Sequence, residues 1–326
     1  MNEISKTLAP QTRRKLKVKP TTTGDKVFSG VTSAAASIAF ILVTLILIFL
    51  FIRAAPALQN QGIDFVFGSE WDPDGSGVMQ IFPMIWGSIV IAALGVVFAT
   101  PMAISTAYLI VFVMGKRASN IATTLVDLLA ALPSVVLGLW GLWVFTPVGE
   151  GWGQILNQYF SWIPIFQVTD VAAGFRSSPF IAGWIVAIMI VPIITSVTRE
   201  IFSQLDRDLI GGALALGGSK ASIFRQIILP TCSRGITGGV LLGVGRALGE
   251  TVAIFYVLDL SFEINWSKLL EPEGGAVASL ILARFGEASS EEVSGLMAAG
   301  LVIFFITLII NFLANGIVAR SKAGTR

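Results

Sequence analysis

Six long apolar stretches restrict the fold of this chain more than any other feature of its sequence. They lie near residues 31–52, 84–113, 121–145, 180–197, 236–258 and 295–318. A helix needs roughly 20 apolar residues to cross the hydrocarbon core of a bilayer, and each stretch is close to that length. Of the 326 residues, 54% are hydrophobic and 13% are charged, which is too apolar for a soluble domain. The sequence therefore predicts an all-α membrane protein with six transmembrane helices.

Three of these stretches contain a proline. Pro101, Pro133 and Pro192 lie in the second, third and fourth stretch. Because proline has no backbone N–H and its ring clashes with the preceding turn, we expect a kink at each of them.

The positions of lysine and arginine predict how the helices are oriented. Most of the 22 basic residues lie in the two terminal tails, the 114–120 turn and the 198–235 segment. Cytoplasmic loops carry such an excess, so we expect these parts, with both termini, on the cytoplasmic side of the cytoplasmic membrane. The alternate loops 53–83, 146–179 and 259–294 contain few basic residues and are expected outside.

We divide the chain into four parts on this basis. Residues 1–29 are a basic cytoplasmic tail, and residues 30–83 are the first transmembrane helix with an outer loop. Residues 84–318 are the main transmembrane domain, with a cytoplasmic segment at 204–234, and residues 319–326 are a cytoplasmic tail. The first apolar region is about 22 residues long against 7–15 in a signal peptide, which favours an uncleaved helix.

The residue types that the chain lacks limit its chemistry. It has no histidine and one cysteine, Cys232. Nucleophile pairs that use histidine, histidine-based metal sites and an intrachain disulfide are therefore excluded. The Walker A sequence G-x4-G-K-[ST] is also missing, so we expect no nucleotide on this chain. We predict no catalytic residue, no metal, no cofactor and no nucleic-acid partner.

One arginine and one glutamate lie within the fifth apolar stretch. Glu250 follows Arg246 by four residues, so in a continuous helix both would leave the same face about one turn apart. A charge at this depth costs about 2.5–3.5 kcal/mol on insertion scales and needs compensation. We expect Gly239 and Gly243 to continue this face toward the cytoplasm, where small residues let another helix approach.

Two interpretations of this pair stay open. It could be a buried ion pair that fixes helix packing, or an anion site, because a guanidinium offers paired donors to a tetrahedral oxyanion. In the second case Glu250 would partly neutralise Arg246, so that the anion can leave as well as enter. Ser134, directly after Pro133, is a further candidate on this pathway, since a hydroxyl at a broken helix can bind an oxyanion; a simple kink is the alternative.

The cytoplasmic segment 204–234 is unusually apolar for an exposed loop. Its apolar residues recur at helical spacing, are interrupted at Gly217-Gly218 and stop at Pro230. We predict two short helices joined at the glycines. Such a hairpin can lie on lipid, pack beneath its own helices or offer its apolar ridge to a groove on a soluble partner.

The spacing in this segment resembles the EAA motif of ABC-importer permeases. Ala213, Gly217, Ile227, Leu229 and Pro230 match the motif, whereas Gly211 and Gly212 replace its glutamate and first alanine. The resemblance implies a type I ABC-importer permease (MetI-like) fold, in which this segment docks on an ATPase subunit. The coupling residues that it implies are Gly211, Gly212, Ala213, Leu216, Gly217, Ile227, Leu229 and Pro230.

Three further segments resemble the phosphate-specific branch of these permeases, and most of all its PstC-type subunits. They are residues 67–88, 131–141 (ALPSVVLGLWG) and 228–251 (ILPTCSRGITGGVLLGVGRALGET) within a resemblance over about 28–318. The resemblance implies import of inorganic phosphate together with a second, PstA-type permease, a dimer of PstB-type ATPase subunits that bind ATP and Mg, and an extracytoplasmic PstS-type phosphate-binding protein.

Other functions remain as alternatives. Nothing at Arg246 distinguishes phosphate from another tetrahedral oxyanion, such as sulfate or molybdate. A stand-alone channel or secondary carrier is a second alternative, and it would transport an anion without an ATPase. A hydrolase is disfavoured because the chain has no histidine.

Overall fold

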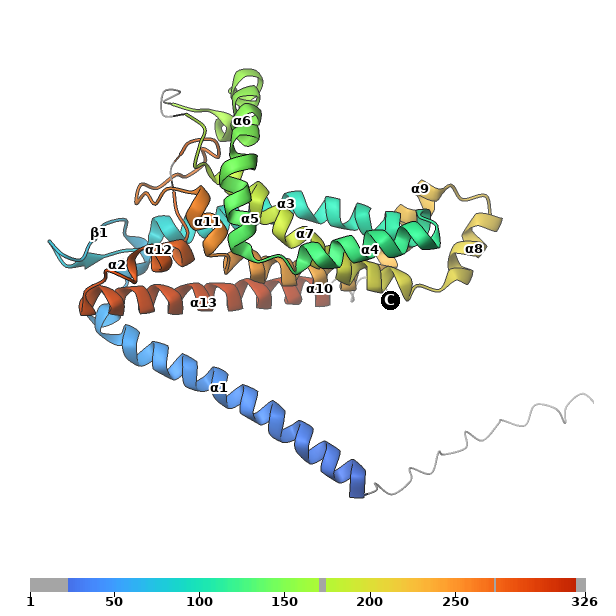
Figure 1. Cartoon of the computed structure of the whole chain (residues 1–326), viewed down its shortest axis with the longest axis horizontal. Coiled ribbons are helices and arrows are strands. Elements are labelled where there is room, and N and C mark those ends of the chain that lie inside the picture. Colours follow the sequence, from blue (N-terminus) through green and yellow to red (C-terminus); the bar gives the residue numbers. More distant parts are fainter. Residues whose placement is uncertain (1–22, 170–173, 273, 321–326) are drawn as a thin grey trace, which may run out of the picture. The chain divides into compact units, whose positions relative to one another are not determined.

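The structure is a computed structural model that describes residues 23–169, 174–272 and 274–320 (Figure 1). The predicted basic tail up to residue 22 and the C-terminal residues 321–326 lie outside these ranges. The chain forms two compact units, Met1–Phe49 and Leu50–Arg326, which we describe separately.

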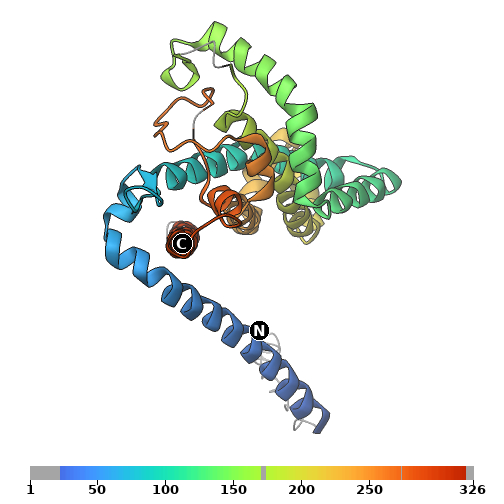
Figure 2. The same ribbon diagram turned by 60° about the vertical axis from the view of Figure 1, so that its left-hand side comes forward.

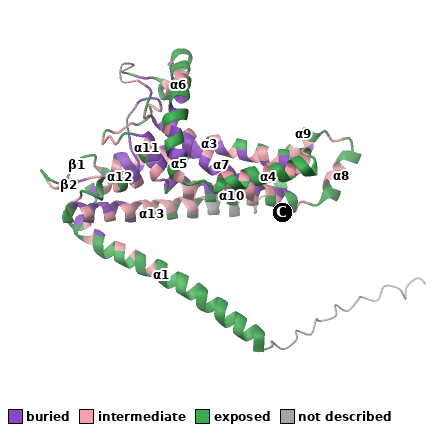
Figure 3. Cartoon of the chain, viewed as in Figure 1, coloured by how far each residue is buried: buried purple, intermediate pink, exposed green. Residues whose placement is uncertain are grey.

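Helix α1 (Thr23–Gln61) contains the apolar stretch of the first unit and ends in the second. None of its most apolar window is buried within the chain, as the exposed colouring of this helix in Figure 3 shows. A helix that is apolar on all sides and not covered by its own protein is suited to contact with lipid.

In the second unit, a serine side chain joins the end of α1 to α13 (Ser290–Arg320). The hydroxyl of Ser294 accepts a hydrogen bond from the Ala57 N–H (3.2 Å) and donates one to the Arg53 carbonyl (2.9 Å). In a regular helix these two backbone groups would bond each other. Pro56 lies beside them within α1, and proline disturbs this ladder. The serine hydroxyl therefore bonds two backbone groups of α1 beside this proline.

Three helices form the core of the second unit: α3 (Phe82–Tyr108), α7 (Pro179–Ser203) and α10 (Leu229–Leu248). Small residues at their contacts bring the backbones close together. A Cβ added at Gly95 of α3 would lie 2.8 Å from a methyl of Val186, and one at Gly183 of α7 would lie 2.7 Å from the Leu94 Cβ. This is the packing expected where helices associate in a membrane.

Among the described residues, five continuous helices and one bent pair are long and apolar enough to cross a membrane. The five are α1, Phe82–Val113 (α3 with the π-helical η2, Leu109–Val113), α7, Lys220–Leu248 and Ser290–Leu313 of α13. They include Pro101 and Pro192, so α3 and α7 continue through these prolines.

The third predicted span, 121–145, is not one helix. Helix α4 (Lys116–Ala130) stops before Pro133, whose backbone is extended (φ −60°, ψ 136°). A second helix then runs at 93° to α4 as α5 (Ser134–Trp140), the π-helical η3 (Gly141–Phe145) and α6 (Thr146–Phe160). Figure 2 shows these three segments, in light green, as one rod. The expected kink at Pro133 is therefore a complete break.

The loops expected outside contain short elements that the hydropathy pattern does not predict. After α2 (Asp64–Phe67), strands β1 (Trp71–Asp72) and β2 (Val78–Met79) form an antiparallel hairpin in which Trp71 faces Met79. The Asp72 carboxylate accepts the N–H groups of Ser76 (2.8 Å) and Gly75 (3.1 Å), which lower its pKa from the ordinary value. This carboxylate holds the turn of the hairpin.

Two outer loops are joined to each other around a buried glutamate. Leu269 donates its N–H to the Ile165 carbonyl next to η4 (Pro164–Phe166). Burial raises the pKa of Glu271, but its bonds to the Thr169 N–H (2.6 Å) and the Lys268 ammonium (3.0 Å) outweigh this effect and lower the pKa. Helix α12 (Val277–Arg284) follows this region and precedes α13.

We expect Gly87→Ala to destabilise the protein by about 1–3 kcal/mol, which is typical of overpacking. A Cβ at this position of α3 would lie 2.0 Å from the carbonyl oxygen of Gly275, and a backbone atom cannot rotate away. The measurement is the thermal unfolding midpoint of the detergent-solubilised chain. Gly30→Ala in α1 is the control, because no heavy atom lies within 4 Å of its added Cβ. Equal midpoints for the two variants would contradict the expectation.

Candidate functional site

The fifth predicted span, 236–258, is broken close to its charged residues. Helix α10 ends at Leu248, and α11 (Val252–Val257) begins after Gly249–Thr251. The Glu250 N–H bonds the Ala247 carbonyl three residues back, so the regular four-residue ladder has ended. A glycine has low helix propensity, and the Glu250 side chain competes for a backbone N–H, which together explain the break.

Arg246 lies in the last turn of α10, not at the centre of a helix. Its side chain is half-buried, and its Nε is buried without a hydrogen-bond partner among the described residues. A cation here is favoured by the carbonyl end of the helix dipole. A buried donor without an acceptor nevertheless costs about 1–3 kcal/mol, so this nitrogen is available to an acceptor oxygen.

Glu250 bonds the backbone of the next helix. Its carboxylate is buried and accepts a hydrogen bond from the Ala253 N–H (3.3 Å) in the first turn of α11. Among the described residues the ion pairs are Arg176–Glu150 (3.1 Å) and Lys268–Glu271 (3.0 Å), both on the outer side. The predicted pairing of Arg246 with Glu250 is therefore wrong, because α10 ends between them and helical spacing no longer places them on one face.

The glycines of α10 face another helix, as predicted. A Cβ at Gly239 would lie 3.1 Å from a methyl of Val197, and one at Gly243 would lie 2.9 Å from Ile194, both on α7. Four-residue spacing continues this row to the buried Ala247. Arg246 is about 20° from Gly239 and about 60° from Gly243 around an ideal helix. It therefore lies at the edge of the glycine face, in keeping with the prediction that Gly239 and Gly243 continue this face.

Arg246 also borders the open side of α10. The residue four positions before it, Leu242, is 59% exposed. A Cβ at Gly238 or Gly245 would meet no heavy atom within 4 Å. The described part of this chain therefore leaves the row that leads to Arg246 uncovered.

The helix that begins with Ser134 packs against the helix that follows Glu250. Ser134 is half-buried and is the first residue of α5, after the extended Pro133. A Cβ at Gly138 of α5 would lie only 2.8 Å from the Cα of Ala253 in α11. The two helix breaks thus lead into segments that are in direct contact, which is the arrangement of broken helices in transporters.

The cytoplasmic segment is a helical hairpin, as predicted. Helix α8 (Arg207–Ala215) and helix α9 (Lys220–Ile223) are joined through Gly217, whose φ of +80° favours glycine. The predicted stop at Pro230 is wrong, because the helix continues from Lys220 to Leu248. The π-helical turn η6 (Phe224–Ile228) precedes the proline and accommodates its missing N–H.

The apolar residues of this hairpin divide into two sets. Ile223 and Ile228 are buried against Phe202 of α7, with Ala213 partly buried beside them. Leu209, Leu214 and Leu216 on or next to α8 are exposed by 48%, 52% and 91%. A Cβ at Gly211 or Gly212 would meet no heavy atom within 4 Å. The hairpin therefore packs beneath its own helices and also presents an apolar ridge with free space beside it.

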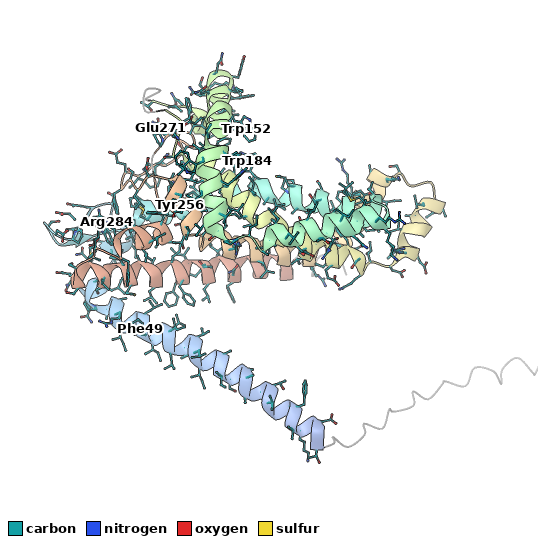
Figure 4. The ribbon with its side chains drawn as sticks, in the orientation of Figure 1. Phe49, Trp152, Trp184, Tyr256, Glu271 and Arg284 are labelled. Atoms are coloured by element: carbon teal, nitrogen blue, oxygen red, sulfur yellow. The ribbon has the colours of Figure 1, made fainter. Side chains whose placement is uncertain are left out.

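An apolar cavity of about 540 Å³ near the loops expected outside was not predicted. Trp184 of α7 stacks on Phe98 of α3 at 4.4 Å and meets Trp152 of α6 edge to face at 5.5 Å (Figure 4). These residues come from three distant segments, so the sequence gives no signal of the cavity.

Comparison with known proteins places these features in a family. Residues 99–326 match the family described as "Binding-protein-dependent transport system inner membrane component". "Phosphate transport system permease protein PstC 2" of Mycobacterium bovis is 34% identical over 94% of this chain and 95% of the relative. The PstC protein of Xylella fastidiosa is also 34% identical, over 87% of this chain and 88% of the relative.

Solved structures of ABC transporters share the fold. A chain of a bacterial alginate ABC transporter, solved with an alginate-bound periplasmic protein, aligns with a TM-score of 0.57 at 18% identity over 90% of this chain and 98% of that chain. A chain of the inward-facing MetNI methionine ABC transporter aligns with a TM-score of 0.52 at 12% identity over 74% of this chain and 95% of that chain. The expected permease fold is confirmed.

If Glu250 stabilises the start of α11, Glu250→Gln should unfold at nearly the parent temperature, because an amide oxygen can still accept the Ala253 N–H. The free energy of unfolding of Glu250→Ala should be lower by about 0.5–2 kcal/mol, the usual cost of removing such a hydrogen bond at a helix start. The thermal unfolding midpoints of the two purified variants measure this difference. A loss in Glu250→Gln as large as that in Glu250→Ala would show that the negative charge, not the hydrogen bond, is what matters.

Proposed function

Because the chain belongs to the family of binding-protein-dependent transport system inner membrane components, we propose that it is the PstC-type permease subunit of an ATP-driven importer of inorganic phosphate. It is a multi-pass membrane protein and a transport component, not the ATP-hydrolysing one. The relatives named as phosphate permeases match nearly the whole chain. This extent supports the same substrate class.

The observation that carries the proposal is the unpartnered Arg246 at the helix break. Its buried Nε has no acceptor, and no carboxylate of the described residues forms an ion pair with it. A guanidinium binds tetrahedral oxyanions through paired donors and stays charged in any environment. We infer that phosphate contacts Arg246 during passage along the open side of α10.

Glu250 and Ser134 have different parts in this proposal. Glu250 keeps the break in place through its bond to the Ala253 N–H, and its buried carboxylate limits how tightly an anion binds nearby. A transporter needs such a limit, because an ion held too tightly is not released. Ser134 begins the helix packed on α11 and supplies a hydroxyl near the same break.

The partners follow from the surfaces that the chain leaves uncovered. We propose that a second, PstA-type permease covers the open side of α10 at Gly238, Leu242 and Gly245. A PstB-type ATPase dimer, which binds the ATP and Mg, docks on the exposed ridge of α8. A PstS-type phosphate-binding protein delivers phosphate to the outer loops, and both termini lie in the cytoplasm.

Another tetrahedral oxyanion, sulfate or molybdate, is the alternative substrate. Arg246 by itself does not distinguish among these anions. Competition of sulfate with labelled phosphate in the reconstituted complex decides between them. Anion transport by the purified single chain in liposomes would instead show a carrier that needs no ATPase.

We expect Arg246→Gln to reduce phosphate uptake at least tenfold in proteoliposomes that contain the complete transporter. This corresponds to the loss of a hydrogen bond to a charged group, about 1.5–3 kcal/mol. Basal ATP hydrolysis should remain, because Arg246 is far along the chain from the coupling hairpin. Arg246→Lys, which keeps the charge but not the paired donors, should retain part of the uptake. Normal uptake by Arg246→Gln would refute the proposed pathway.

We expect Leu216→Asp to reduce co-purification of the ATPase subunit several-fold, because it places a charge on the most exposed apolar residue of the hairpin. Asn120→Asp on the exposed surface of α4 adds the same charge outside the hairpin and is the matched control. Gly211→Glu, which restores the motif carboxylate in open space, should not weaken the association. Equal losses for Leu216→Asp and Asn120→Asp would argue against docking at the ridge.

A further inference from the structure

A polar cavity of about 720 Å³ lies between the π-helical turn η2, α4, α7 and the start of the coupling hairpin at α8. It is lined by the π-helical turn η2, the start of α4, the end of α7 and the first residue of α8. Its volume is in the range of about 300–1,000 Å³ that is usual for ligand sites. None of the proposed transport or coupling residues lines it.

Positive charge dominates this cavity. Lys116 of α4, Arg199 of α7 and Arg207 of α8 line it, with Glu200 as the only lining carboxylate. None of the three cations forms an ion pair with a carboxylate in the described ranges. Glu200 accepts instead a hydrogen bond from the Gln204 amide (2.9 Å). Three cations and one carboxylate leave an excess of positive charge in this space, which an anion would offset.

The uncharged groups of the cavity also suit an anion. The hydroxyls of Ser119 and Thr123 on α4 line the same space. Lys116 is the first residue of α4, a 15-residue helix whose N-cap, Gly115, gives no side-chain hydrogen bond to the first N–H groups. The start of a helix carries partial positive charge and free N–H groups. Hydroxyls, N–H groups and cations together match the oxygens of a phosphoryl group.

We propose that this cavity binds a phosphoryl group on the cytoplasmic side, at a site separate from Arg246. The group is either free phosphate or the headgroup of an anionic phospholipid. An anion held between Lys116 and Arg207 would tie the start of α4 to the start of α8 and restrain the coupling hairpin. If the ligand is free phosphate, this inference rests on the proposed function, and imported phosphate would then restrain its own importer.

The first test measures free phosphate binding to the full chain in nanodiscs of neutral phosphatidylcholine. All proteins carry Arg246→Gln, so that the proposed transport site contributes nothing. Inorganic phosphate should raise the thermal unfolding midpoint. In Arg199→Gln or Lys116→Gln, the phosphate concentration needed for the same rise should be at least tenfold higher. Arg117→Gln, next to Lys116 but outside the cavity lining, should bind like the parent.

The second test replaces free phosphate with lipid. The same proteins are purified from membranes containing phosphatidylglycerol, and native mass spectrometry counts the retained lipid. If the parent and Arg117→Gln retain phosphatidylglycerol and Arg199→Gln does not, the lipid headgroup is the ligand. Ser119→Ala, which keeps every charge, replaces Arg199→Gln if that variant does not fold, and it should weaken binding two- to tenfold.

The inference is overturned if neither phosphate nor phosphatidylglycerol binds, or if Arg117→Gln loses binding as much as Lys116→Gln does. Failure of the proposed import function is a separate result. Because these assays measure binding in an Arg246→Gln background, the cavity can bind a phosphoryl group even if the intact transporter moves another anion.

Discussion

A backbone N–H or C=O inside a bilayer has no water to bond, and this constraint governs the structure of the chain. Helices meet it by bonding internally, so a helix can be interrupted only where protein covers the freed groups. Both interruptions, before α5 and before α11, lead into helices that are pressed together at Gly138 and Ala253. The segments that follow the two breaks therefore cover each other, and Arg246 lies in the last turn before the second break.

Close packing of small residues gives this site a rigid frame. Glycines of α10 contact α7, while α3 and α7 approach each other at Gly95 and Gly183. Backbones this close leave little freedom for the core helices to slide. The open side of α10 is different, since Leu242 is exposed and Gly245 contacts nothing nearby. One face of this helix is thus packed against its own chain, and the described residues leave another face uncovered.

Hydropathy alone predicts most of the fold, because burial in lipid depends on composition averaged over about 20 residues. It predicts the spans, the protein-facing glycines and the hairpin at Gly217. It does not predict the break at Gly249, because whether a helix stops there depends on cover from α5, which is more than 100 positions earlier in the chain. The Arg246–Glu250 pair was wrong for the same reason. The sequence does not predict the cavity next to the hairpin, because residues from four separate helical segments line it.

The two hydrogen bonds of the Ser294 hydroxyl fix the axial register between the end of α1 and α13. Dispersion contacts between apolar surfaces change little when one helix slides by a residue. The Arg53 carbonyl and the Ala57 N–H, by contrast, lie beside one proline, and a shift of one residue would break both serine hydrogen bonds. A single hydroxyl group therefore sets the depth at which the end of α1 lies along α13, which hydrophobicity cannot specify.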